Sequence, residues 1–165
     1  MPPRGLYLTA VDFLGPAVGY ATGFRRGSGA TCAAAVFRTS DGGARWRLLP
    51  GSCRPYGLDA VEFLDAHTGF VGGGEPYYAR DRPFQALLST RDGGRSWRTV
   101  FRGRVAERAN LPLNRLAFAD PRHGLAVSAG CKTGQNGPCG GALLATLDGG
   151  RSWHATTVAL PLAGS

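Results

Sequence analysis

Three aspartates recur in the same eight-residue setting, and carboxylates that recur in this way could bind a metal ion or act as catalytic acids. A calcium loop needs several oxygen ligands at close spacing, whereas here each aspartate is followed by two glycines. Asp-Gly-Gly between apolar runs is typical of a hairpin turn, because the carboxylate accepts backbone N–H groups and the glycines supply positive φ. We therefore expect turn caps here, with no metal and no cofactor. The three segments, called boxes below, are Thr39–Trp46 (TSDGGARW), Thr90–Trp97 (TRDGGRSW) and Thr146–Trp153 (TLDGGRSW).

The other positions of the box also have structural roles. The threonine can donate its hydroxyl to the aspartate two residues later. The tryptophan can bury its ring at the root of the hairpin, with its indole N–H near a backbone acceptor. All three tryptophans of the protein end a box, which indicates a repeat. The predicted structural residues are Thr39, Asp41, Gly43, Trp46, Thr90, Asp92, Gly94, Trp97, Thr146, Asp148, Gly150 and Trp153.

Two further carboxylates, Glu75 and Asp120, could belong to an active site. A glycosidase needs two carboxylates that face each other about 5 to 9.5 Å apart. Glu75 lies near Tyr77, Tyr78 and two arginines, but Asp120 has an equivalent in Asp65 of the preceding repeat. We interpret both aspartates as turn residues and predict no catalytic residue. The histidines His67, His123 and His154 lack any paired metal-ligand spacing.

The spacing of the boxes indicates the elements that hold them. Asp41 and Asp92 are 51 residues apart, and Asp92 and Asp148 are 56 apart, close to the period of roughly 40 to 50 residues of a propeller blade. Apolar residues alternate ahead of each box, which is the period of a strand with one packed face. We predict three four-stranded blades, at about 6–52, 56–101 and 111–159 of a single segment 1–165, with the box between the third and fourth strands. In the first repeat the strands are predicted at 8–14, 19–24, 34–39 and 46–49.

The box, S/T-x-D-G-G-x-x-W, resembles the Asp-box (bacterial neuraminidase) repeat of sialidases, sortilin-type propellers, xyloglucanases and photosystem II assembly-factor-like propellers. The wider repeat is most similar to the last group: an apolar strand with F-x-D, then G-aromatic-x-x-G, then the box. It is carried by Leu58–Gly73 and Leu113–Gly130, with Leu8–Gly23 a looser copy.

The resemblance implies an all-β propeller segment that acts as an extracytoplasmic, non-catalytic binding or assembly scaffold. The R-I-P signature of sialidases is absent. A fragment of a sialidase-like or xyloglucanase-like glycoside hydrolase is the alternative function. Closed propellers have about four to eight blades, so we expect missing blades or self-association.

The long segments between predicted strands are expected on one rim of the propeller, with the boxes on the other. These loops contain nine basic residues against three acidic ones, in a chain of formal charge +8. Function often lies on loops that a rigid scaffold holds, so we predict that this loop-rich face binds an acidic protein segment or another anionic surface. No nucleic-acid motif is present. The candidate binding residues are Arg25, Arg26, Arg54, Tyr56, Tyr77, Tyr78, Arg80, Arg82, Arg104 and Arg108.

Four cysteines complete the set of reactive side chains. Cys32 and Cys53 have equal sequence offsets from the first Gly-Gly turn, so they should lie opposite each other, and Cys131 and Cys139 flank a short loop. We predict the disulfides Cys32–Cys53 and Cys131–Cys139, and from them an oxidising, extracytoplasmic or secreted location. The chain has no membrane-spanning apolar run, and its first residues do not resemble a signal peptide.

Overall fold

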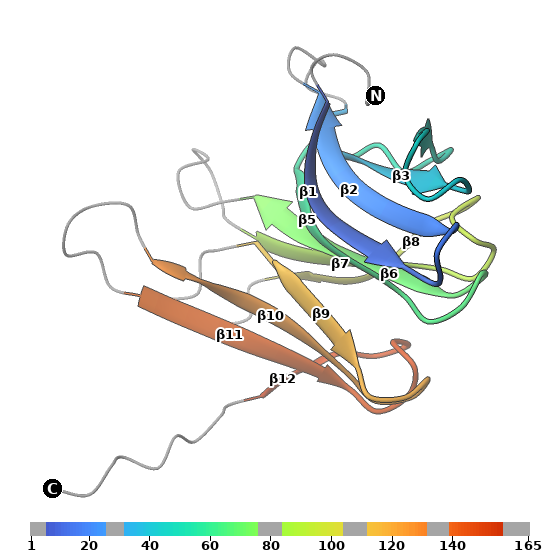
Figure 1. Ribbon diagram of the computed structural model, residues 1–165. Coiled ribbons are helices and arrows are strands. Elements are labelled where there is room, and N and C mark those ends of the chain that lie inside the picture. Colours follow the sequence, from blue (N-terminus) through green and yellow to red (C-terminus); the bar gives the residue numbers. More distant parts are fainter. Residues whose placement is uncertain (1–5, 26–31, 76–83, 104–111, 132–138, 157–165) are drawn as a thin grey trace, which may run out of the picture.

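The computed structural model describes residues 6–25, 32–75, 84–103, 112–131 and 139–156; it describes the backbone only of Leu6, Arg25, Glu75, Ala129, Gly130, Cys131, Cys139 and Gly140. Within these ranges all regular elements are β-strands (Figure 1). They are β1 (Leu6–Phe13), β2 (Gly19–Arg25), β3 (Ala35–Thr39), β4 (Arg47–Leu48), β5 (Gly57–Phe63), β6 (Gly69–Glu75), β7 (Phe84–Thr90), β8 (Arg98–Gly103), β9 (Arg115–Phe118), β10 (Gly124–Cys131), β11 (Cys139–Thr146) and β12 (His154–Thr156).

The strands form three four-stranded antiparallel sheets, here called blade 1 (β1 to β4), blade 2 (β5 to β8) and blade 3 (β9 to β12). Neighbours in sequence are neighbours in each sheet, so each blade is an up-and-down meander. The predicted all-β fold and its four-stranded blades are confirmed. The blades stand side by side as a segment of a β-propeller (Figure 1).

Each blade begins with a tight contact between its first two strands. The phenylalanine that ends the first strand lies over the glycine that starts the second, as in Phe63 over Gly69. A Cβ on Gly69 would lie 2.6 Å from the Phe63 ring, so no side chain fits there. The same pair recurs as Phe13 with Gly19 and Phe118 with Gly124. The glycine that starts each second strand therefore marks a place where a ring packs against bare backbone.

The box hairpins and the turns between first and second strands lie on the same rim. The first glycine of each box donates its N–H to a carbonyl of that turn. The bonds run from Gly42 to Ala17 (3.0 Å), from Gly93 to His67 (2.9 Å) and from Gly149 to Arg122 (2.9 Å). The second strands of the blades begin at this rim and end at the opposite one.

Two apolar clusters join the blades. One lies between blades 1 and 2 and includes Tyr20 and Phe63, whose rings stack with centroids 3.4 Å apart. The other lies between blades 2 and 3 and includes Phe70, stacked on Phe118 at 4.6 Å. The core therefore lies between the sheets, as expected for repeats that cannot bury their faces alone.

The first strands of the three blades, β1, β5 and β9, line a common cavity of ≈ 440 Å³. Two carboxylates on these first strands accept hydrogen bonds from the next blade. Asp12 accepts the N–H of Phe63 at 2.7 Å, and Glu62 accepts that of Phe118 at 3.0 Å. Burial, with a smaller contribution from the nearby Asp12, raises the pKa of Glu62.

Candidate functional site

The aspartate of each box is a hydrogen-bond acceptor inside its own hairpin. The threonine hydroxyl donates to the carboxylate at 2.8 Å in boxes 1 and 2 and at 2.9 Å in box 3. Backbone N–H groups that follow the two glycines donate to the same oxygen: Arg45 to Asp41 and Ser96 to Asp92 at 2.9 Å, and Ser152 to Asp148 at 3.0 Å. One oxygen of each box aspartate is therefore bonded within its own hairpin.

These bonds stabilise the ionised carboxylates. The side-chain hydroxyl and backbone N–H of Ser96 lower the pKa of Asp92 from 3.8 to about 2, with help from Thr90. Ser152 acts in the same way on Asp148, whose pKa lies well below its ordinary value. At Asp41 the residue in place of the serine is Arg45, and its backbone N–H is the main cause of a lowered pKa. A carboxylate held ionised in this way is a poor general acid.

The box glycines take the positive φ that the turn requires, 70° and 85° at Gly93 and Gly94. The tryptophan rings pack edge-on against the phenylalanine of their own blade, as in Trp97 with Phe63 at 6.2 Å. One detail differs from the sequence-based expectation. The indole Nε1 atoms of Trp97 and Trp153 are buried with no hydrogen-bond acceptor among the described residues, because their rings pack in the apolar clusters between the blades.

Asp65 and Asp120 occupy equivalent turns and make equivalent bonds. Asp65 Oδ1 accepts the N–H groups of His67 and Thr68 at 2.6 and 2.7 Å. Asp120 Oδ1 accepts those of Arg122 and His123, and its Oδ2 lies 2.7 Å from His123 Nδ1. The backbone N–H of Arg122 and the His123 side chain lower the pKa of Asp120 to about 2. Both residues are exposed turn caps.

The Cys32–Cys53 disulfide is present, with Cα atoms 4.8 Å apart. The other predicted pair, Cys131 and Cys139, are direct register partners on β10 and β11; their bond stays a prediction, since their side chains lie outside the described set. A disulfide in a small β protein is compatible with an oxidising compartment.

Arg54 and Tyr56 are the predicted binding residues of the loop-rich face whose side chains the structure describes. Tyr56 packs with Phe84 and Arg102 of blade 2. The guanidinium of Arg102 lies 4.2 Å from the Phe84 ring centroid and 5.9 Å from that of Tyr56. Tyr56 is buried and packs edge-on against Phe84, so it supports this face from beneath. Arg54 donates from Nη1 to the carbonyls of Gly51 and Cys53 at 2.8 and 2.7 Å.

Most of the predicted binding residues have no described side chain. Outside the described ranges lie Arg26, Tyr77, Tyr78, Arg80, Arg82, Arg104 and Arg108, and Arg25 has a described backbone only. For them the loop-rich face stays a prediction.

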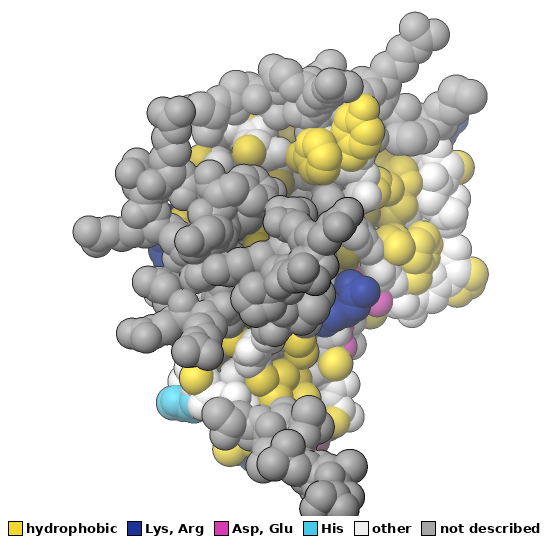
Figure 2. Space-filling view, turned by 90° about the vertical axis from the view of Figure 1, so that its left-hand side faces the viewer, with side chains coloured by type: hydrophobic (Ala, Val, Ile, Leu, Met, Phe, Trp, Pro, Cys, Tyr) yellow, Lys and Arg dark blue, Asp and Glu magenta, His cyan; other side chains and the backbone are white. Residues whose placement is uncertain are grey.

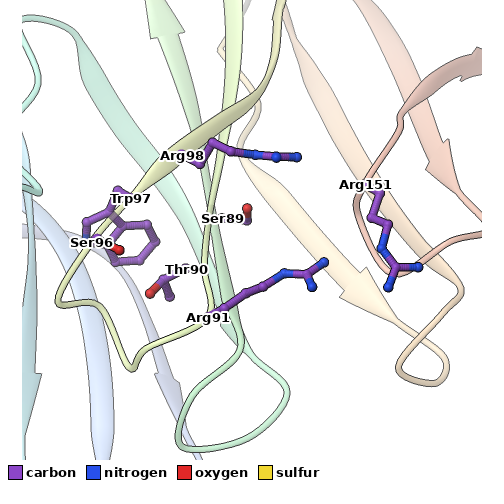
Figure 3. Close-up of a pocket in the computed structure, with 7 residues that line it drawn as sticks. All are labelled: Ser89, Thr90, Arg91, Ser96, Trp97, Arg98 and Arg151. Carbon is purple, nitrogen blue, oxygen red and sulfur yellow. The ribbon is translucent and has the colours of Figure 1, made fainter.

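The structure brings together a different set of arginines, between boxes 2 and 3. Arg91, Arg98 and Arg151 line a groove of ≈ 460 Å³ together with Ser89, Thr90, Ser96 and Trp97. Figure 3 shows Arg91 and Arg98 extending from blade 2 into the gap, with Arg151 on the other side of it. Among the described residues that line this groove, none is acidic. We call it the arginine groove.

The guanidinium groups of the arginine groove have no carboxylate partner. In the described part of the chain the ion pairs join histidines to aspartates, and no arginine is paired with a carboxylate. Arg151 makes one long bond, 3.5 Å, from Nη1 to the Asp148 carbonyl. A second groove at the equivalent place between blades 1 and 2 is lined by Arg38, Arg47 and Arg95, but it also contains Asp92 and His67.

The sequence reasoning missed the arginine groove because it concentrated on the long loops. Arg91 and Arg151 occupy variable positions of different boxes, and Arg98 follows the tryptophan of box 2. The available signal was that the variable box positions are rich in arginine. Their convergence depends on which blades are neighbours.

Comparison with known proteins supports the fold. No family model matches the chain, and no curated protein matches it. A solved structure described as "YCF48 bound to D1 peptide" aligns with a TM-score of 0.57 and 18% sequence identity. The alignment covers 93% of this chain and 40% of that chain, so this chain spans less than half of its length. At this identity the likeness shows a propeller-like fold.

Two further properties bear on function. Among the described residues no group of three or more histidine, cysteine, aspartate or glutamate side chains could hold a metal ion. The described part of the chain also contains no helix that is long and apolar enough to cross a membrane.

Proposed function

We propose that this chain is a non-catalytic binding scaffold of the Asp-box propeller type and that its ligand is an acidic protein segment. The observation that carries the proposal is the arginine groove, in which Arg91, Arg98 and Arg151 lie together and no described acidic side chain is part of the lining. Guanidinium groups present planar paired donors that fit carboxylates, and unpaired ones keep these donors available. A groove of ≈ 460 Å³ is large enough to accept a carboxylate-bearing side chain.

The scaffold around the groove supports this role. Arg91 and Arg151 are on hairpins that the box aspartates and threonines hold by hydrogen bonds, so the charges are on rigid turns. The solved propeller of similar fold is described as bound to a peptide, which fits a binding role here. Arg102 of β8, which lies over the Phe84 ring, provides a further positive charge for the same kind of ligand. The Cys32–Cys53 disulfide fits the extracytoplasmic location that we propose for this scaffold.

A hydrolase function has less support in the described residues. The box aspartates, Asp65 and Asp120 all use their oxygens to cap turns, and Asp120 has a pKa of about 2, too low for the general acid of a glycosidase. Glu75 is the remaining candidate of the sequence analysis.

The test is binding of a fluorescein-labelled hexaglutamate peptide, measured by fluorescence anisotropy, with hexaglutamine as the neutral probe. Arg98→Gln should weaken hexaglutamate binding about fivefold, as for the loss of about 1 kcal/mol from an exposed charged contact. Arg122→Gln is the matched control, because Arg122 is exposed on a turn of the same rim and does not line the groove. Binding should also weaken with salt, since exposed charges are screened within about 10 Å at 0.1 M ionic strength.

Equal losses for Arg98→Gln and Arg122→Gln would show non-specific attraction to a basic protein and contradict the groove as the site. A larger loss in Arg102→Gln than in Arg98→Gln would move the site to the loop-rich face. Salt-insensitive binding would contradict the acidic ligand. Hydrolysis of a sialoside or a β-glucan that Glu75→Gln abolishes would reject the scaffold function in favour of the hydrolase.

A further inference from the structure

The two contacts between blades are built from the same parts. In each, an aromatic residue at the start of the second strand of one blade stacks on the phenylalanine of the next: Tyr20 on Phe63, and Phe70 on Phe118. In each, the residue before the phenylalanine of the earlier blade is a carboxylate that accepts the N–H of the later phenylalanine. Two independent contacts with the same parts indicate a general rule for how a blade docks onto the next one.

The second glycine of the box is part of the same contact. A Cβ on Gly94 would lie 2.4 Å from Leu49 of blade 1, and one on Gly150 would lie 2.2 Å from Phe70 of blade 2. A side chain from the earlier blade therefore lies against each of these glycines. At Gly43 of blade 1 a Cβ would meet, among the described residues, Phe13 and Trp46 of its own blade at 3.8 Å. The place of the incoming side chain is open there.

The face of blade 1 that carries Gly43 has the residues of a docked blade, but no blade among the described residues packs on it. Leu58 and Phe63 of blade 2 are 1% and 4% exposed, whereas their equivalents Leu8 and Phe13 are 42% and 44% exposed. Val11 is exposed too, while its equivalent Val61 is buried. Hydrophobic side chains reach the surface in several groups on the side of the molecule drawn in Figure 2. We call Leu8, Val11, Phe13 and Gly43 the end face.

We propose that the end face is the docking surface for one further four-stranded blade, presented by a partner polypeptide. That blade carries an aspartate or glutamate on its innermost strand, to accept the N–H of Phe13, and a tyrosine or phenylalanine at the start of its second strand, to stack on the Phe13 ring. The commitment to this occupant rests on continuity with the two contacts already present in the chain.

A second copy of this chain, docked through its blade 3, would not supply this carboxylate and this aromatic ring. At the carboxylate position it has Ala117, and at the aromatic position it has Leu125, which is 41% exposed. Alanine offers no acceptor to the Phe13 N–H, and leucine offers no ring to stack. Head-to-tail association of identical chains would therefore lose both specific interactions and keep only apolar burial.

The test uses the full chain with an added blade at its N-terminus. The added segment is a second copy of residues 54–103, which contains Glu62 and Phe70, joined by a flexible Gly-Ser linker so that docking is intramolecular. Hydrogen–deuterium exchange of β1 amides is measured, and we expect it to slow at least about tenfold on docking. The matched control carries Glu62→Ala and Phe70→Leu in the added copy only, which gives it the features of blade 3.

Protection of β1 by the first extension and not by the control supports the proposal. Phe13→Ala in the extended chain should then remove the protection, and in the chain without extension it should lower the melting temperature less than Phe63→Ala does. Equal protection by both extensions, or protection by neither, overturns the proposal. A dimer of the unextended chain in which β1 is already protected assigns the end face to a second copy and also overturns it.

Discussion

At the scale of single residues, the boxes show how a carboxylate can recur without a catalytic role. Each box aspartate accepts a hydroxyl and a backbone N–H of its own hairpin, and in boxes 2 and 3 a serine hydroxyl adds a further bond at 2.6 Å. The bonds favour the ionised form and hold the two glycines in the turn. The chemistry of these residues is therefore used to fix the hairpin geometry.

The lowered pKa values predict a loss of stability in acid. A group whose pKa is depressed by folding contributes stability above its unfolded pKa and loses it as the pH falls through the folded value. For Asp92 this window lies between 3.8 and about 2. We expect the free energy of unfolding, measured in urea, to fall across this window, and Asp92→Asn to reduce that fall.

Asp59→Asn is the control for this experiment. Burial raises the pKa of Asp59, so its contribution to the pH dependence has the opposite sign. If Asp92→Asn left the acid loss unchanged, the box carboxylate would not be its source.

At the scale of elements, the first disulfide shows how a loop shifts a strand pairing without separating the cysteines. Phe37 pairs with Leu48, in the register set by the box turn, but Ala34 pairs with Arg54, three residues further along. The extra residues form a bulge in which the Ser52 hydroxyl donates to the Leu49 carbonyl at 2.7 Å and accepts the Val36 N–H at 3.1 Å. A polar side chain thus takes the place of ladder bonds.

We predict that both cysteine pairs are oxidised and that they do not exchange partners. Peptide mapping without reduction should find Cys32 linked to Cys53 and Cys131 to Cys139. Each bond should stabilise the fold by about 2 to 4 kcal/mol, through restriction of the unfolded chain. Cys32→Ser with Cys53→Ser, compared with Cys131→Ser with Cys139→Ser, separates the two contributions in urea unfolding. Free thiols or crossed pairs in the map would refute the pairing.

At the scale of the whole molecule, the position of a blade in the row decides what its residues do. Phe13 and Phe63 are the same residue type at the same place in the repeat, yet one is exposed and the other is buried against Tyr20. The arginine groove likewise exists only because box 3 lies beside blade 2. Both binding surfaces proposed above, the arginine groove and the end face, depend on which blades are neighbours.

The same reasoning predicts unequal effects of equivalent tryptophan substitutions. Trp153 is buried and contacts Phe70 of blade 2 as well as Phe118 of its own blade. Trp153→Ala should destabilise the protein by about 3 to 5 kcal/mol, the usual cost of deleting a buried aromatic ring. Trp46 stacks edge-on with Phe13 on the open end face, so Trp46→Ala should cost less than half as much in urea unfolding. Equal costs would show that the neighbouring blade does not stabilise the box.

The sequence by itself determined the features that depend on short-range chemistry. Asp-Gly-Gly selects its turn within four residues, alternation selects the packed face of a strand, and the repeat of both along the chain indicated three blades. These predictions were confirmed because each depends on neighbours in the chain.

Only the tertiary structure decided which side chains meet across blades. Arg98 and Arg151 lie more than fifty residues apart in the chain, and their meeting depends on how one sheet packs on the next. The same packing distinguishes Phe13 from Phe63, and it leaves the Trp97 and Trp153 indole N–H groups without an acceptor among the described residues. Burial and convergence are set by long-range packing, which a local pattern does not contain.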